Sequence, residues 1–147
     1  MRPVYHVIVS IGLSGLMVYW FRSWAAGVSC LLSGILIDLD HHLDYLFIRK
    51  KFPFRYRQLL DYCEKDPRWR PYLIFHSYEF LLLFWMSIYY FRLNEIWIAA
   101  ALSASVHLIC DQTVNPFKPL AYFFIYRFKH GFERKEILSD DHSDGVF

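Results

Sequence analysis

Five ionisable side chains fall within seven residues at the end of a long apolar run. The stretch GILIDLDHHLDYL, residues 34–46, carries Asp38, Asp40, His41, His42 and Asp44. Imidazoles and carboxylates without thiolates suit zinc, iron or manganese. An ionisable group inside a membrane costs on the order of 2.5–3.5 kcal/mol. Several such groups in one place therefore predict a bound cation, because a cation would offset that cost.

The same residue types recur at three other positions along the chain. They are His6 near the start, His76 with Glu79 in the middle, and His107 with Asp111 further on. The last pair is spaced i,i+4, which places both side chains on one face of a helix. Metal sites in helical bundles are built from side chains that project inward from several helices.

Long apolar segments must position these side chains. The four longest are Tyr5–Phe21, Trp24–Leu39, Pro71–Phe91 and Ile96–Cys110, and a shorter one is Leu120–Phe128. The chain is 56% hydrophobic, above the roughly 45–50% of soluble domains. A membrane span takes about 20 apolar residues, which the third segment meets and the others approach. We predict an all-α integral membrane bundle of four transmembrane helices with a shorter C-terminal helix, forming one domain over residues 1–147.

Basic residues are distributed unevenly over this topology. Of sixteen Lys and Arg residues, all but Arg22 and Arg92 fall on one side of the predicted membrane. The positive-inside rule then places both termini, the basic loop 49–70 and the polar tail 129–147 in the cytoplasm. Successive spans run in opposite directions, so the ionisable groups of all four segments are expected at the cytoplasmic face of the inner membrane. Membrane lipid is the expected partner, and no nucleic acid is expected.

Less specific interpretations remain open for several of these features. The first segment also fits a secretory signal, and the whole chain fits a soluble bundle of buried helices. His6 and His42 fit interfacial side chains, and Asp44 fits a helix cap or a partner of the basic loop. His130 and His142 lie in the polar tail and are expected at the surface. Three scattered cysteines without CxxC spacing argue against a disulfide framework and a cysteine-type zinc site.

Four short motifs resemble those of the bacterial membrane-bound metal-dependent hydrolases, the group that includes the LexA-binding inner-membrane hydrolase. They are His6 in the first segment, GILIDLDHH at residues 34–42, FHS around His76, and HLICD from His107 to Asp111. The resemblance covers residues 1–115. The chain departs from the pattern at Ile37, where a proline is usual, and at Pro71, where a histidine is often found. The pattern is also remotely similar to zinc-dependent phospholipase C.

The residues and the resemblance together predict a metal-dependent hydrolase, with zinc as the favoured ion and iron or manganese as alternatives. The predicted metal ligands are His6, Asp38, Asp40, His41, His76, His107 and Asp111. Asp38 and Glu79 are the candidates for orienting the attacking water. A substrate at the depth of the lipid headgroups would be a phosphoester, with a lipid among the candidates. The alternatives are a metal transporter or sensor, and a structural helical protein whose His and Asp residues only cap helices and pair with Arg and Lys.

Overall fold

The structure, a computed structural model, describes residues 3–50, 56–66 and 69–139. This part of the chain is helical apart from its connecting segments and one isolated bridge between Phe117 and Leu138. The chain divides into two compact units. Unit 1 comprises Met1–Ile37 and Glu79–Asn115, and unit 2 comprises Asp38–Tyr78 and Pro116–Phe147.

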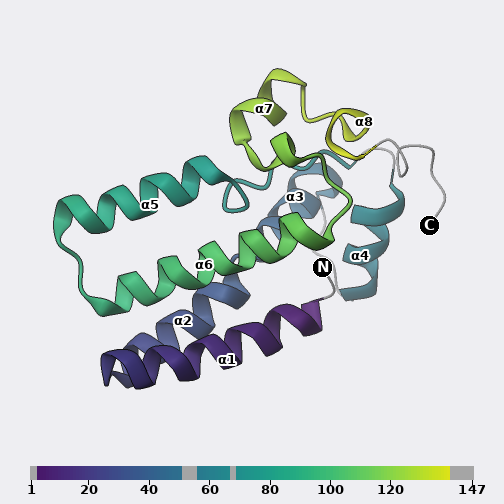
Figure 1. The fold of residues 1–147 in the computed structure, drawn as a ribbon. Coiled ribbons are helices and arrows are strands. Elements are labelled where there is room, and N and C mark those ends of the chain that lie inside the picture. Colours follow the sequence, from purple (N-terminus) through teal and green to yellow (C-terminus); the bar gives the residue numbers. More distant parts are fainter. Residues whose placement is uncertain (1–2, 51–55, 67–68, 140–147) are drawn as a thin grey trace. The chain divides into compact units, whose positions relative to one another are not determined.

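Unit 1 contains four helices: α1 (Pro3–Phe21), α2 (Trp24–Leu36), α5 (Tyr78–Phe91) and α6 (Glu95–Val114). Helix α2 packs against both α1 and α6, and α5 and α6 form an antiparallel hairpin (Figure 1). Two glycines allow the close approach of α2. A Cβ atom at Gly27 would lie 2.2 Å from Val18 Cγ2, and one at Gly34 would lie 2.2 Å from Ser10 Oγ.

Serine hydroxyls link helix α2 to α1 and to α6. Ser14 Oγ donates to the carbonyl of Gly27 at 2.7 Å, and Ser33 Oγ donates to that of Ala100 at 2.9 Å. Small residues that let backbones approach, with hydroxyls that bond across the contact, are typical of helix packing in membranes. The packing therefore fits the segment composition from which a membrane bundle was predicted.

Two helices in the described part of the chain are long and apolar enough to cross a membrane, over Val4–Phe21 and Glu95–Val114. Signal sequences and buried core helices have the same length and composition, so the finding is compatible with a membrane location and does not by itself establish one. Helices α2 and α5 have 13 and 14 residues, fewer than the roughly 17 that a span needs. Four spans thus stay a prediction.

Two expected helix limits differ in the structure. The second segment does not continue as one helix through Leu39, because α2 ends at Leu36 and a new helix, α3 (Leu39–Arg49), follows a turn. The third segment becomes helical only at Tyr78, not at Pro71. The backbone N–H groups of Phe75 and His76 donate to the carboxylate of Asp40 instead of to a helical ladder.

Unit 2 consists of short elements: α3, α4 (Tyr56–Lys65), η1 (Pro119–Tyr122), α7 (Phe124–Lys129) and α8 (Arg134–Ile137). Helix α4 lies within the predicted basic loop, and η1 and α7 replace the single C-terminal helix that was expected. Tyr62, Trp69 and Leu73 form the core of the unit. Backbone hydrogen bonds from Lys118 N to Ile137 O and from Ser139 N to Pro116 O, both 2.9 Å, close the C-terminal segment on itself.

Candidate metal centre

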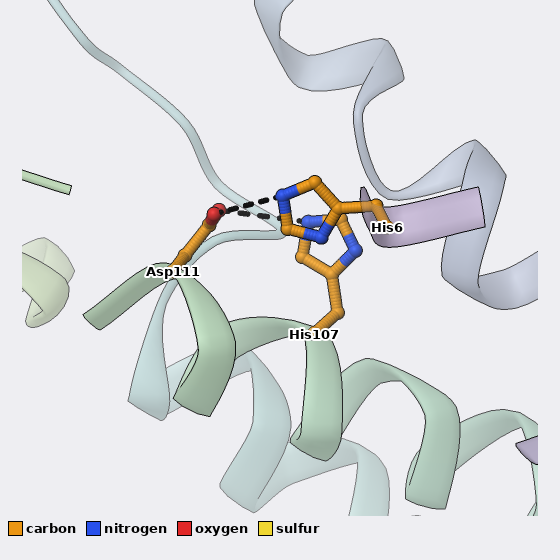
Figure 2. A group of neighbouring side chains, drawn as sticks. All are labelled: His6, His107 and Asp111. Carbon is orange, nitrogen blue, oxygen red and sulfur yellow. Dashed lines mark ion pairs between the residues drawn. The ribbon is translucent and has the colours of Figure 1, made fainter. Parts of the chain in front are cut away.

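Helices α1 and α6 bring three predicted ligands together in unit 1. His6 lies near the start of α1, and His107 and Asp111 lie near the end of α6. All three are at most 5% exposed. His6 Nε2 is 3.0 Å from Asp111 Oδ1, and His107 Nε2 is 3.5 Å from Asp111 Oδ2. Figure 2 shows the carboxylate directed at both rings. We call these three residues the unit 1 triad.

A backbone carbonyl fixes the ring of His107 within the unit 1 triad. Its Nδ1 lies 3.0 Å from the carbonyl oxygen of Gly34 in α2. A carbonyl only accepts, so Nδ1 carries the hydrogen and donates it. In a neutral ring, Nε2 then presents its lone pair toward Asp111. This tautomer, with one nitrogen donating and the other facing the site, is the one found in metal-binding histidines.

The two rings of the unit 1 triad are stacked. Their centroids are 3.9 Å apart and their planes differ by 14°, so both Nε2 atoms approach the same carboxylate from one side (Figure 2). One ligand atom from each residue lies within 4.8 Å of the others. Three ligands at that spacing can surround one cation, since zinc bonds to nitrogen and oxygen are near 2.0–2.2 Å.

Unit 2 holds a second group of predicted site residues around His76. His76 Nδ1 is 3.3 Å from Asp40 Oδ2, and its Nε2 is 3.4 Å from Asp38 Oδ1. Asp40 and His76 are buried, whereas the side chain of Asp38 is 29% exposed. Asp40 Oδ2 also accepts from the backbone N–H groups of Phe75 and His76. We call Asp38, Asp40 and His76 the unit 2 cluster.

Three other residues of the DLDHHLD stretch have different surroundings. The ring centroid of His41 is 5.1 Å from that of His76, and its Nδ1 is 3.9 Å from Cys63 Sγ. His42 Nδ1 lies 3.5 Å from the backbone oxygen of Asp38. Asp44 is buried in the middle of α3 and caps no helix end. Burial, and then the charge of Asp40, raise the pKa of Asp44 to about 7.

The remaining predicted residues lie elsewhere. Glu79 is half-buried in the first turn of α5, and His76 precedes that helix. His130 is partly buried, with Nδ1 2.8 Å from Tyr126 O. His142 lies outside the described residues.

Sequence reasoning missed two residues around these clusters. One is Gly34, whose backbone carbonyl orients His107. Arg127, assigned only to the basic side of the membrane, is 2% exposed and donates to the carbonyls of Leu73 and His76. The signal for Arg127 is its place inside the apolar run LAYFFIYRF, where a charge is unexpected.

No family model, no curated protein and no solved structure matches this chain.

Proposed function

We propose that this protein is a membrane-bound metal-dependent hydrolase whose metal site includes the unit 1 triad. The observation that carries the proposal is the ring of His107. Its Nδ1 donates to Gly34 O, and its Nε2 faces a carboxylate oxygen of Asp111 at 3.5 Å. A lone pair facing a buried carboxylate is unfavourable unless a positive charge lies between them.

That positive charge is either a proton or a metal ion. His6 directs its own Nε2 at Asp111 and stacks on His107 at 3.9 Å. Protonating both rings would place two cations face to face in a buried site. One divalent cation bound by all three residues offsets the carboxylate charge without that repulsion. The donor set of imidazole and carboxylate favours zinc, with iron or manganese as alternatives.

Within unit 2, the contacts of the unit 2 cluster also suit metal chemistry. Asp40 accepts from His76 Nδ1 and so orients Nε2, as a carboxylate does for metal-binding histidines. Asp38 is the more exposed of the two carboxylates of the cluster, which suits a base that orients water. A divalent metal ion would lower the pKa of a bound water to about 7 and polarise a phosphoryl oxygen. The proposed reaction is hydrolysis of a phosphoester.

A location in the inner membrane, with both termini and the site at the cytoplasmic face, is part of the proposal. Helix α1 exposes large apolar side chains that lipid would cover, among them Ile8, Ile11, Leu16 and Trp20. The α1–α2 and α5–α6 turns lie at the end of unit 1 opposite the triad (Figure 1). A cysteine introduced at Asn94 should react with an impermeant maleimide in intact cells. Reaction only after cell lysis would indicate that Asn94 faces the cytoplasm and that the proposed orientation is wrong.

Elemental analysis of the detergent-purified protein tests the metal site directly. We expect bound divalent metal in the wild type and its loss in His107→Ala. His130→Ala, which changes a histidine outside both clusters, should keep the metal. Chelation should abolish hydrolysis of phosphodiester and phospholipid substrates, and added zinc or manganese should restore it. A wild type that binds no metal would leave proton-bridged His–Asp pairs as the explanation.

A further inference from the structure

Arg127 is a buried arginine in a helix of only six residues. It is 2% exposed, while its neighbours Phe128 and Lys129 on α7 are exposed. Removing a guanidinium from water is costly unless hydrogen bonds and opposite charge offset the loss. The contacts that offset this cost therefore indicate what the residue does.

The guanidinium contacts the loop that carries His76. Arg127 Nη2 donates to the carbonyl oxygen of Leu73 at 2.8 Å and, more weakly, to that of His76 at 3.4 Å. Its charge also lowers the pKa of Asp44, against the larger upward effect of burial. One side chain thus contacts both ends of the segment from Leu73 to His76.

Asp40 binds the same segment through the opposite backbone groups. Its Oδ2 accepts from the N–H groups of Phe75 and His76 and lies 3.3 Å from His76 Nδ1. A cation on the carbonyls and an anion on the amides match the two ends of the peptide dipole. The segment needs such partners, because it lacks regular secondary structure and Leu73 has a φ of +36°.

Contacts made by the C-terminal segment hold α7 in place. The bridge between Phe117 and Leu138 closes the segment that contains α7. Phe132 packs against Tyr72 at 4.6 Å and Phe124 at 5.6 Å between ring centroids, which joins this segment to the loop before His76. These contacts bring the helix to the loop, and the guanidinium then binds the loop carbonyls.

We propose that Arg127 is a positioning residue that fixes the imidazole of His76 through the backbone of residues 73–76. The residue lies outside residues 1–115, where the motifs occur. The role in metal binding rests on the proposed function, but the positioning of His76 does not. Two measurements therefore test the two statements separately.

Amide hydrogen exchange tests the positioning without any metal. In metal-free Arg127→Gln, we expect the amides of Phe75 and His76 to exchange at least about tenfold faster, measured by mass spectrometry of peptides covering residues 72–78. Arg127→Lys keeps the charge and one donor and should give a smaller increase. Met17→Ala, which removes a core side chain from unit 1, should lower the melting temperature without this local change. Lys129→Gln, exposed on the same helix, should match the wild type.

Cobalt binding tests the consequence for the metal site. In Arg127→Gln, the dissociation constant for Co²⁺ should rise by roughly 10–100-fold, as for other residues that orient a ligand. If the wild type binds no Co²⁺ but exchange changes as expected, the positioning role stands and the metal role fails. Unchanged exchange in Arg127→Gln, or an equal change in Met17→Ala, would overturn the positioning role. If Arg127→Gln does not fold, Arg127→Lys is compared with Met17→Ala at matched melting temperature.

Discussion

The unit 1 triad and the unit 2 cluster use the same arrangement around one histidine. In each, Nδ1 lies against an acceptor and Nε2 faces a carboxylate oxygen. For His107 the two groups are Gly34 O and Asp111, and for His76 they are Asp40 and Asp38. The acceptor is a neutral backbone carbonyl in unit 1 and a carboxylate in unit 2.

This difference shows that the two clusters depend on different parts of the fold. The unit 1 triad requires only that α1, α2 and α6 pack correctly, since its residues lie on helices. The unit 2 cluster requires an irregular loop to keep its shape, which Asp40 and Arg127 stabilise from its amides and its carbonyls. A carboxylate also raises the basicity of the ring that it orients more than a carbonyl does.

The largest effect is expected from removing the two histidines. His107→Ala and His76→Ala should each lower the hydrolysis rate by more than the roughly 10–100-fold typical of an orienting residue. If the clusters serve one reaction, the double variant should be little worse than either single variant, because groups that act as a unit are not additive. Steady-state rates of the three variants test this. Losses that multiply would indicate two independent sites.

A second difference is that unit 2 buries an additional carboxylate, Asp44. Its Oδ2 has no hydrogen-bond partner among the described residues. Burial, and then the charge of Asp40, raise its pKa from 3.8 to about 7. The folded protein therefore holds this proton at pH values where the unfolded chain has released it.

Stability should fall as the pH rises from about 4 to about 7 and then level off. The unfolded state binds fewer protons in this range, so the free energy of unfolding decreases with pH. At about 1.4 kcal/mol per pKa unit, the loss from Asp44 reaches up to about 4 kcal/mol. Asp44→Asn should remove this dependence, measured as the melting temperature relative to wild type from pH 4 to 8. Asp61→Asn, at an exposed site on α4, should leave it unchanged.

Much of unit 1 could be predicted from the sequence. The first and fourth apolar segments correspond to α1 and α6, because continuous apolar runs of that length form helices. The i,i+4 spacing of His107 and Asp111 correctly placed both side chains on one face of α6. Opposite helix directions also correctly placed His6 beside them, since the start of α1 and the end of α6 meet.

Unit 2 was harder to predict because long-range polar contacts override local pattern there. Residues 71–77 read as the start of a membrane helix, but Asp40, 35 residues away from Phe75 in sequence, takes their amides. Arg127 is 51 residues from His76. No periodicity connects residues at such separations, so neither contact could be read from the sequence. Asp40 was predicted as a metal ligand, and its contacts favour the orienting role proposed above.

An intermediate effect is expected from neutralising Asp40. Asp40→Asn keeps the shape but replaces the carboxylate at His76 Nδ1, and metal affinity should fall by roughly 10–100-fold. Titration with Co²⁺ followed by its absorption spectrum measures this. If Asp38 orients the attacking water and does not orient His76, Asp38→Asn should keep the metal affinity closer to that of the wild type and lower the hydrolysis rate. Equal losses of affinity in both variants would show that Asp38 is itself a ligand.

The orienting group of the unit 1 triad cannot be removed by mutation, because it is the backbone carbonyl of Gly34. It can only be displaced. A Cβ atom at this position would lie 2.2 Å from Ser10 Oγ and 2.7 Å from Ser103 Oγ. Both serines are at most 4% exposed, so their side chains must rotate, or α2 must move away from α1 or α6, to make room.

Gly34→Ala should therefore lower the free energy of unfolding by about 1 kcal/mol net, the smallest effect of the series. Overpacking costs about 1–3 kcal/mol, and the better helix propensity of alanine returns about 0.5–1 kcal/mol. Gly12→Ala is the matched control, since a Cβ there meets nothing within 4 Å and should leave stability equal or higher. Metal affinity should fall in Gly34→Ala alone, because only this change shifts the acceptor of His107 Nδ1. If both variants bind Co²⁺ like the wild type, the Gly34 carbonyl does not orient the ligand.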